Sequence, residues 1–227
     1  MIKPFKVNML TGLVMSIVLL GVISASMTLV TTGVYRDLTF DFQRDYMTQL
    51  VSMRAQDILD EQSADAARLG LRIQGMASFR QAFFAGDADR LRAELEDQFR
   101  QGIITANIVR VLKLHAFDPA FEPLAEATRG ALLPDSSGVV CPEVLAAARG
   151  RSGAEKLKPY AGLCSHGDRP YQAVIVPVGG LQPYGYLMLV SDPVPAFAAI
   201  DGLLQMPVVL ESPAGEPLYR SGDWEAA

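Results

Sequence analysis

An uncharged, mostly apolar stretch from Met9 to Tyr35 constrains this 227-residue chain more than any other feature. It runs for roughly 27 residues, whereas about 20 apolar residues in a helix are enough to cross the hydrocarbon core of a bilayer. The stretch therefore predicts a single transmembrane anchor at residues 9–35, and the lipid bilayer is the first expected partner. About 190 residues follow it, enough for a domain with a core of its own.

A cleaved signal peptide is the alternative interpretation of this stretch. Ala25 lies between Ser24 and Ser26, which is a weak small-residue cleavage pattern. We favour the uncleaved anchor because the apolar run is longer than the core of a secretory signal and continues past that site. Both interpretations export the rest of the chain.

The charges that flank the stretch predict its orientation. Only Lys3 and Lys6 precede it, and a mixed, weakly acidic set that begins at Arg36 follows it. Because Lys and Arg are enriched on the cytoplasmic flank of membrane helices, the tip at residues 1–8 is expected in the cytoplasm. The chain is thus expected to be a single-pass protein of the bacterial inner membrane, with its N-terminus cytoplasmic and its bulk in the periplasm.

The exported part is acidic. The whole chain carries 20 Lys and Arg residues against 25 Asp and Glu residues, and two of the basic residues belong to the tip before the anchor. Nucleic-acid binding requires clustered positive charge, so no nucleic-acid partner is expected.

Both cysteines, Cys141 and Cys164, lie in the exported part, where thiols are normally oxidised. We expect a disulfide between them, which closes a loop of about 23 residues and contributes roughly 3 kcal/mol in the chain-entropy model. Two unrelated buried thiols are one alternative, and a reactive Cys141 at a helix start is another. The histidines His115 and His166 lack zinc-type spacing, so we expect no metal site, and we expect no cofactor.

A long helix is expected directly after the anchor, over residues 36–85. Apolar residues recur there mostly at three- and four-residue steps, as in Phe42, Tyr46 and Leu50, and no proline interrupts the segment. The pattern predicts about 45 helical residues, with Gly70 as the place where the helix is most easily broken. One small domain cannot cover such a stripe, so we expect two copies to pair along it as a homodimer.

The remainder, residues 86–224, mixes short strands with short helices. In chain order the expected elements are a helix after Asp87 or Asp89, a strand at 108–115, a loop with one helical turn at 117–134, a helix at 142–149, strands at 171–178 and 184–190, a helix after Pro193 and a last hairpin at 207–221. Hairpins instead of regular crossover helices join the strands, so the expected fold class is α+β with an antiparallel sheet and flanking helices.

Three segments of this part carry a family resemblance. They are Asn107–Asp118, Arg169–Pro193 (RPYQAVIVPVGGLQPYGYLMLVSDP) and Met206–Trp224 (MPVVLESPAGEPLYRSGDW). In element order and texture, residues 36–224 resemble the extracytoplasmic Cache-type, PAS-like sensor domains of bacterial chemoreceptors, diguanylate cyclases and sensor kinases. The resemblance implies a signalling and dimerisation helix at 36–85, a Cache-like sensor domain at 86–224 and a short tail at 225–227.

The chain also departs from this family. Amino-acid-binding members bind the ammonium and carboxylate of their ligand with a set of Tyr, Arg, Trp and Asp residues. The only tryptophan in this chain is Trp224, at its far end, so the resemblance does not imply an amino-acid ligand. No second span and no catalytic output segment follow in the sequence. The chain is expected to be either the sensing part of a longer receptor or a short protein that acts through a partner.

The sequence offers little support for catalysis. Ser165, His166 and Asp168 lie too close along the chain to converge as nucleophile, base and orienting acid. Gly179 and Gly180 mark a hairpin turn, because no Lys-Ser or Lys-Thr pair follows them as in a phosphate-binding loop. We therefore expect no enzyme activity in this chain, and any catalytic output would lie outside it.

Binding remains, and in PAS-like domains the ligand lies between one face of the sheet and the segments that cover it. The candidate residues come from the first strand and from the hairpin, and they are Arg110, Lys113, His115, Arg169, Tyr171, Tyr184 and Tyr186. An arginine holds a carboxylate with two hydrogen bonds, tyrosine rings wall an apolar body, and a histidine titrates near neutral pH. Each candidate is also open to a structural interpretation, as a solvated edge charge or an ordinary sheet residue.

The sequence thus predicts a membrane-anchored periplasmic sensor domain. It is expected to bind an unidentified small molecule, or a periplasmic binding protein, and to transmit the signal through its N-terminal helix. The alternative is a membrane-tethered scaffold or docking subunit that binds a protein partner and no small ligand. A pocket with inward polar groups favours the sensor, and a filled core with an exposed apolar patch favours the scaffold.

Overall fold

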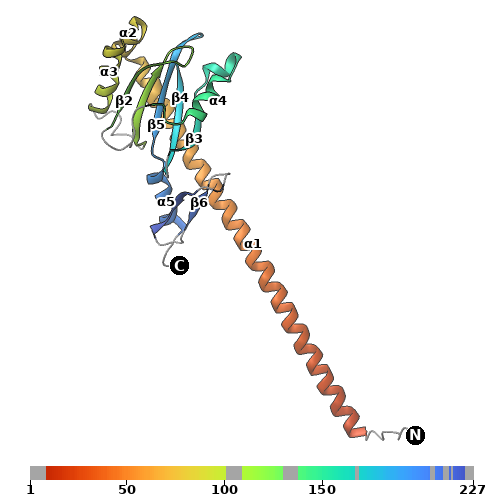
Figure 1. Ribbon diagram of the computed structural model, residues 1–227. Helices are drawn as coiled ribbons and strands as arrows, with labels where there is room; N and C mark the ends of the chain where they lie inside the picture. The colour runs from red at the N-terminus through yellow and green to blue at the C-terminus, as the bar shows by residue number, and fades with distance from the viewer. Residues whose placement is uncertain are drawn as a thin grey trace. The chain divides into compact units, whose positions relative to one another are not determined.

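The computed structural model describes residues 9–100, 109–129, 138–166, 169–204, 208–211, 215 and 217–222 (Figure 1). The chain divides into two compact units, Met1–Met53 and Arg54–Ala227. Helix α1 (Met9–Gly75) contributes residues to both units.

The first unit contains the apolar part of α1. Residues Gly12–Thr32 form a helical segment of 21 residues that is long and apolar enough to cross a membrane, judged by length and composition alone. Its hydroxyl groups donate hydrogen bonds to the carbonyl oxygens four residues earlier, in the pairs Ser16–Gly12, Thr28–Ser24, Thr31–Met27 and Thr32–Thr28. This back-bonding removes the need for water at each hydroxyl, which suits a lipid environment.

The second unit is built around a five-stranded antiparallel sheet (Figure 1). Its strands are β1 (Val111–Phe117), β2 (Pro123–Thr128), β3 (Tyr160–His166), β4 (Arg169–Gly179) and β5 (Pro183–Ser191). They are arranged in the order β2-β1-β5-β4-β3. The expected α+β class with an antiparallel sheet is confirmed.

Helices cover the first face of this sheet with an apolar core. The last turns of α1 contribute Ala66, Leu69 and Ile73, which pack with α2 (Ala77–Ala85), α3 (Ala88–Arg100) and the sheet. The helix expected over 36–85 is interrupted at Met76, whose backbone is extended (ψ 133°). The continuous segment therefore ends in the domain core at Gly75, and the rest of the expected helix is α2.

Two of the local predictions for these helices concern Asp87 and Gly70. Asp87 caps α3, because its Oδ1 accepts a hydrogen bond of 3.0 Å from the Arg90 N–H. Gly70 does not break α1; it lets the helix approach the sheet closely. A Cβ at that position would lie 2.8 Å from Val176 Cγ2 and 3.0 Å from Leu189 Cδ1, so a larger residue would push α1 off the sheet.

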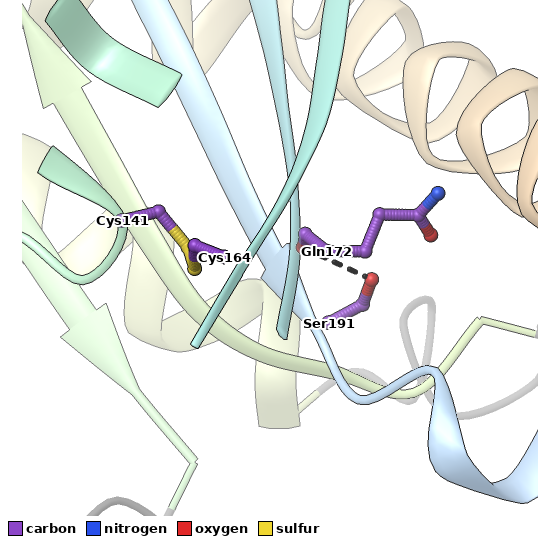
Figure 2. The surroundings of a disulfide bond; sticks show 4 residues. All are labelled: Cys141, Cys164, Gln172 and Ser191. Carbon is purple, nitrogen blue, oxygen red and sulfur yellow. Dashed lines mark hydrogen bonds between the residues drawn. A yellow bond between two sulfur atoms is a disulfide. The ribbon is translucent and has the colours of Figure 1, made fainter. Parts of the chain in front are cut away.

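The opposite face, which we call the second face, is covered by α4 (Pro142–Arg149) and carries a separate apolar core. The expected disulfide is present: Cys141, immediately before α4, is bonded to Cys164 of β3, with Cα atoms 5.4 Å apart (Figure 2). It fixes the start of α4 to an edge strand of the sheet. A short 3-10 helix, η2 (Gly153–Leu157), leads from α4 to β3.

Two strands differ from expectation. The segment expected as a loop with a helical turn contains β2, in which Glu126 lies opposite His115 and Thr128 lies opposite Lys113. The sequence pattern does not predict strand β3. The composition of β2 (PLAEAT) favours a helix locally, and pairing with β1 overrides that preference.

The C-terminal segment forms α5 (Val194–Leu204) and a two-stranded sheet of β6 (Val209–Glu211) and β7 (Pro217–Arg220). These are the last helix and the last hairpin expected from the sequence. The backbone N–H of Ser221 donates to Val208 O at 2.9 Å, and the Val208 N–H donates to Ser221 Oγ at 3.0 Å. Trp224 and the tail expected at 225–227 lie outside the described residues.

Candidate functional site

Four of the seven candidate residues share the second face of the sheet. Leu114 and Ala116 of β1 belong to the core on the first face, so the alternate residues Lys113 and His115 point to the second. Tyr171 from β4 and Tyr186 from β5 are part of the apolar core on that second face.

The two β1 residues form a buried polar cluster with Glu126 of β2, which we call the Lys113–Glu126–His115 cluster. Lys113 Nζ lies 2.8 Å from the Gly138 carbonyl oxygen, to which it donates, and 3.1 Å from Glu126 Oε2. His115 Nδ1 lies 3.4 Å from the same Oε2 atom. The Lys113 side chain is fully buried and that of Glu126 is 37% exposed, so the carboxylate spans the boundary between the core and solvent.

His115 is neutral in this environment. Burial, with the Lys113 charge as a second cause, lowers its pKa from 6.5 to about 3. The carboxylate beside Nδ1 favours the tautomer that carries its proton there, so Nε2 is a hydrogen-bond acceptor. Nε2 is buried and has no hydrogen-bond partner among the residues that the structure describes.

Aromatic rings of the second core lie on the same face of the sheet as the cluster. The His115 ring stacks on Phe117, with centroids 5.7 Å apart, and Tyr186 stacks on Phe121 at 4.0 Å. Burial raises the pKa of Tyr186 and of Tyr171, so both phenols stay protonated at neutral pH. The second face thus combines apolar and aromatic walls with a small polar group, which is the usual composition of a small-molecule site.

The other three candidates are not brought to this cluster. Arg110 precedes β1, is half-exposed, and lies 3.8 Å from Asp192 Oδ2 in an ion pair. Arg169 is exposed at the start of β4, opposite His166. Tyr184 is 55% exposed and packs edge-on against Phe84, with ring centroids 5.1 Å apart. Among the described residues, therefore, neither candidate arginine lies at the Lys113–Glu126–His115 cluster, where it could hold a ligand carboxylate.

Sequence reasoning missed Glu126 and the Gly138 carbonyl. Glu126 has a recognisable signal, because Ala125 and Ala127 alternate with Glu126 and Thr128, which is the period of a strand. The Gly138 carbonyl belongs to the backbone, and no side-chain pattern indicates it.

Two further expectations concern a catalytic group and a metal site. Ser165 and His166 lie at the end of β3, and Asp168, the third residue of that group, falls outside the described part of the chain. Within the described part, no group of three or more His, Cys, Asp or Glu side chains is placed to hold a metal ion.

Comparisons with known proteins add a distant likeness to solved structures. No protein-family model matches the chain, and no curated protein matches it. Among solved structures, a domain of a sensory box/GGDEF family protein from Vibrio parahaemolyticus is similar with a TM-score of 0.36 and 13% sequence identity, over 72% of this chain and 67% of that chain. A TM-score of this size does not establish a shared fold, so the fold class is assigned from the topology of the sheet.

Proposed function

We propose that this chain is a membrane-anchored sensor in which the second face of the sheet binds a small molecule and α1 carries the change towards the membrane. Anchoring by residues 12–32, a periplasmic position for the sheet and pairing of two copies along α1 belong to the same proposal. The apolar composition of that segment supports the anchoring, and the basic tip before it supports the orientation.

The observation that carries the proposal is the unpartnered His115 Nε2 in the Lys113–Glu126–His115 cluster. A buried polar atom without a partner costs about 1–3 kcal/mol, so nearly all such atoms in folded proteins are paired. An apolar residue at position 115 would avoid this cost. A ligand that donates to Nε2 would supply the missing partner and so accounts for a histidine at this place.

Strand β4 supplies a route from the second face to α1. Its residues alternate, so that Tyr171 faces the second core while Gln172 points to the other side, away from the disulfide (Figure 2). Gln172 Nε2 donates to the Leu59 carbonyl oxygen at 2.9 Å and lies 2.8 Å from Ser63 Oγ. A ligand that prefers one position of β4 thereby biases the position of α1, to the extent of its differential affinity for the two positions.

Replacement of Gln172 by Met tests this route. Met preserves the length of the side chain but removes both contacts to α1, so we expect a loss of about 1–2 kcal/mol in the free energy of unfolding. Hydrogen exchange of the α1 amides around Leu59 and Ser63 should become faster. Gln182→Met, at an exposed turn position, is the matched control and should change neither quantity. Unchanged exchange in Gln172→Met would remove β4 as the link to α1.

Ligand-induced stabilisation tests the function itself. We expect at least one compound in a panel of organic acids, amides, alcohols, amines and purines to raise the melting temperature of the 227-residue chain in detergent micelles. At ten times its dissociation constant such a ligand stabilises the folded state by about 1.4 kcal/mol, a shift of a few degrees. The shift should disappear in His115→Phe. Cooperative melting with no shift in any compound class would instead favour the docking-scaffold alternative.

A further inference from the structure

The charges of the Lys113–Glu126–His115 cluster are already matched within the protein. The Lys113 ammonium faces the Glu126 carboxylate at 3.1 Å and the Gly138 carbonyl oxygen at 2.8 Å. A ligand carboxylate directed at Lys113 would have to displace Glu126, which exchanges one carboxylate for another and gains little. Among the described residues of this face, the buried polar atom without a hydrogen-bond partner is an uncharged one, His115 Nε2.

The electrostatics at the His115 ring disfavour a charged ligand group there. Among the described residues, the charged groups near the ring are Lys113 from its own strand and Glu126 from β2, and Glu126 lies on the Nδ1 side. Burial and the Lys113 charge penalise a proton on this imidazole, and the same two effects penalise a ligand ammonium beside Nε2. An anion is disfavoured as well, because Nε2 presents a lone pair and no proton.

We propose that the ligand of the second face is an uncharged molecule that donates an O–H or N–H hydrogen bond to His115 Nε2 and places an apolar body against Phe117 and Met188. This inference rests on the proposed function, since it names the ligand class of the same site. Phe117 stacks on the His115 ring. In the sheet, His115 is paired with Glu126 of β2 on one side and with Met188 of β5 on the other. Both are fully buried apolar residues of the second core.

Four probes with the same four-carbon body and different head groups test the ligand class. They are butyramide and 1-butanol, which are neutral donors, butyrate, which is an anion, and butylamine, which is a cation. Each is titrated into the 227-residue chain in detergent micelles with 15N-labelled histidine, and the His115 Nε2 resonance is followed. This resonance reports directly whether the atom accepts a hydrogen bond. If His115 had only a structural role, the resonance would not move when a probe is added.

We expect the two neutral donors to bind and to shift the His115 Nε2 resonance, and the two charged probes to bind at least tenfold more weakly. His115→Phe keeps a flat ring in the stack and should abolish binding, as read by melting temperature. His166→Phe, at the exposed end of β3, should leave the affinity unchanged.

The outcomes separate the ligand class from the function. Binding of butyrate or butylamine with a shift of the His115 resonance would overturn the neutral class while it supports a small-molecule site on the second face. A His115 resonance that no probe shifts, up to the solubility limit of each, would overturn both. Binding of the neutral donors that persists in His115→Phe would place the contact elsewhere and overturn the inference.

Discussion

Lowering the pH from 7 to about 4 is expected to reduce the free energy of unfolding of the wild-type chain by about 3 kcal/mol more than it reduces that of the His115→Phe variant. The pKa of His115 is about 3 in the folded state and 6.5 as the reference value for the unfolded chain. Between these two values the unfolded state binds more protons than the folded state. Stability attributable to His115 is therefore fully present above about pH 6.5 and is lost as the pH falls through this window.

The comparison with His115→Phe isolates this single group. The two proteins differ only at position 115, so the difference between their pH profiles reports on this side chain and its immediate contacts. Urea unfolding at a series of pH values measures the effect, and His166→Phe is the matched control because His166 is exposed. Parallel pH profiles for wild type and His115→Phe would show that the folded state admits a proton to this ring, and hence that water reaches it.

Periodicity and turn residues were sufficient to predict most of the fold. The apolar run, the alternation in β4 and β5 and the proline at the start of α4 each act over a few neighbouring residues, so the chain displays them directly. Strands β2 and β3 were missed because their strand character comes from partners far away in sequence. Glu126, for example, lies in a segment of helix-forming residues and becomes a strand residue through its pairing with His115.

The candidate site was predictable in part. Lys113 and His115 are predicted as binding candidates on the more polar face of the first strand, with a solvated edge charge or an ordinary sheet residue as the alternative, whereas every residue of β1 is buried. The difference is physical: β1 lies between β2 and β5 and is buried on both faces, so these polar side chains must find partners within the protein. Arg110 and Arg169, which look equally suitable in the sequence, end at exposed positions outside the cluster.

The second large effect is expected from removal of Glu126. Glu126→Leu leaves the fully buried Lys113 ammonium without its carboxylate and His115 Nδ1 without its acceptor, so we expect a loss of about 3 kcal/mol in the free energy of unfolding at neutral pH. Lys113→Met should cost only about 1 kcal/mol, because the carboxylate that remains is 37% exposed and is solvated by water. Denaturant unfolding of the two single variants measures this asymmetry.

The double variant Lys113→Met/Glu126→Leu decides whether the loss comes from removal of the ion pair itself or from the Lys113 charge that remains when only Glu126 is removed. Replacement of a whole buried ion pair by apolar residues of similar size is often close to neutral, so we expect the double variant to lie within about 1 kcal/mol of wild type and well above Glu126→Leu. A double variant as unstable as the Glu126→Leu single variant would show that Lys113 contributes nothing to the cost. The buried ammonium would then be solvated by other means, and the charge matching on which the neutral ligand class depends would be wrong.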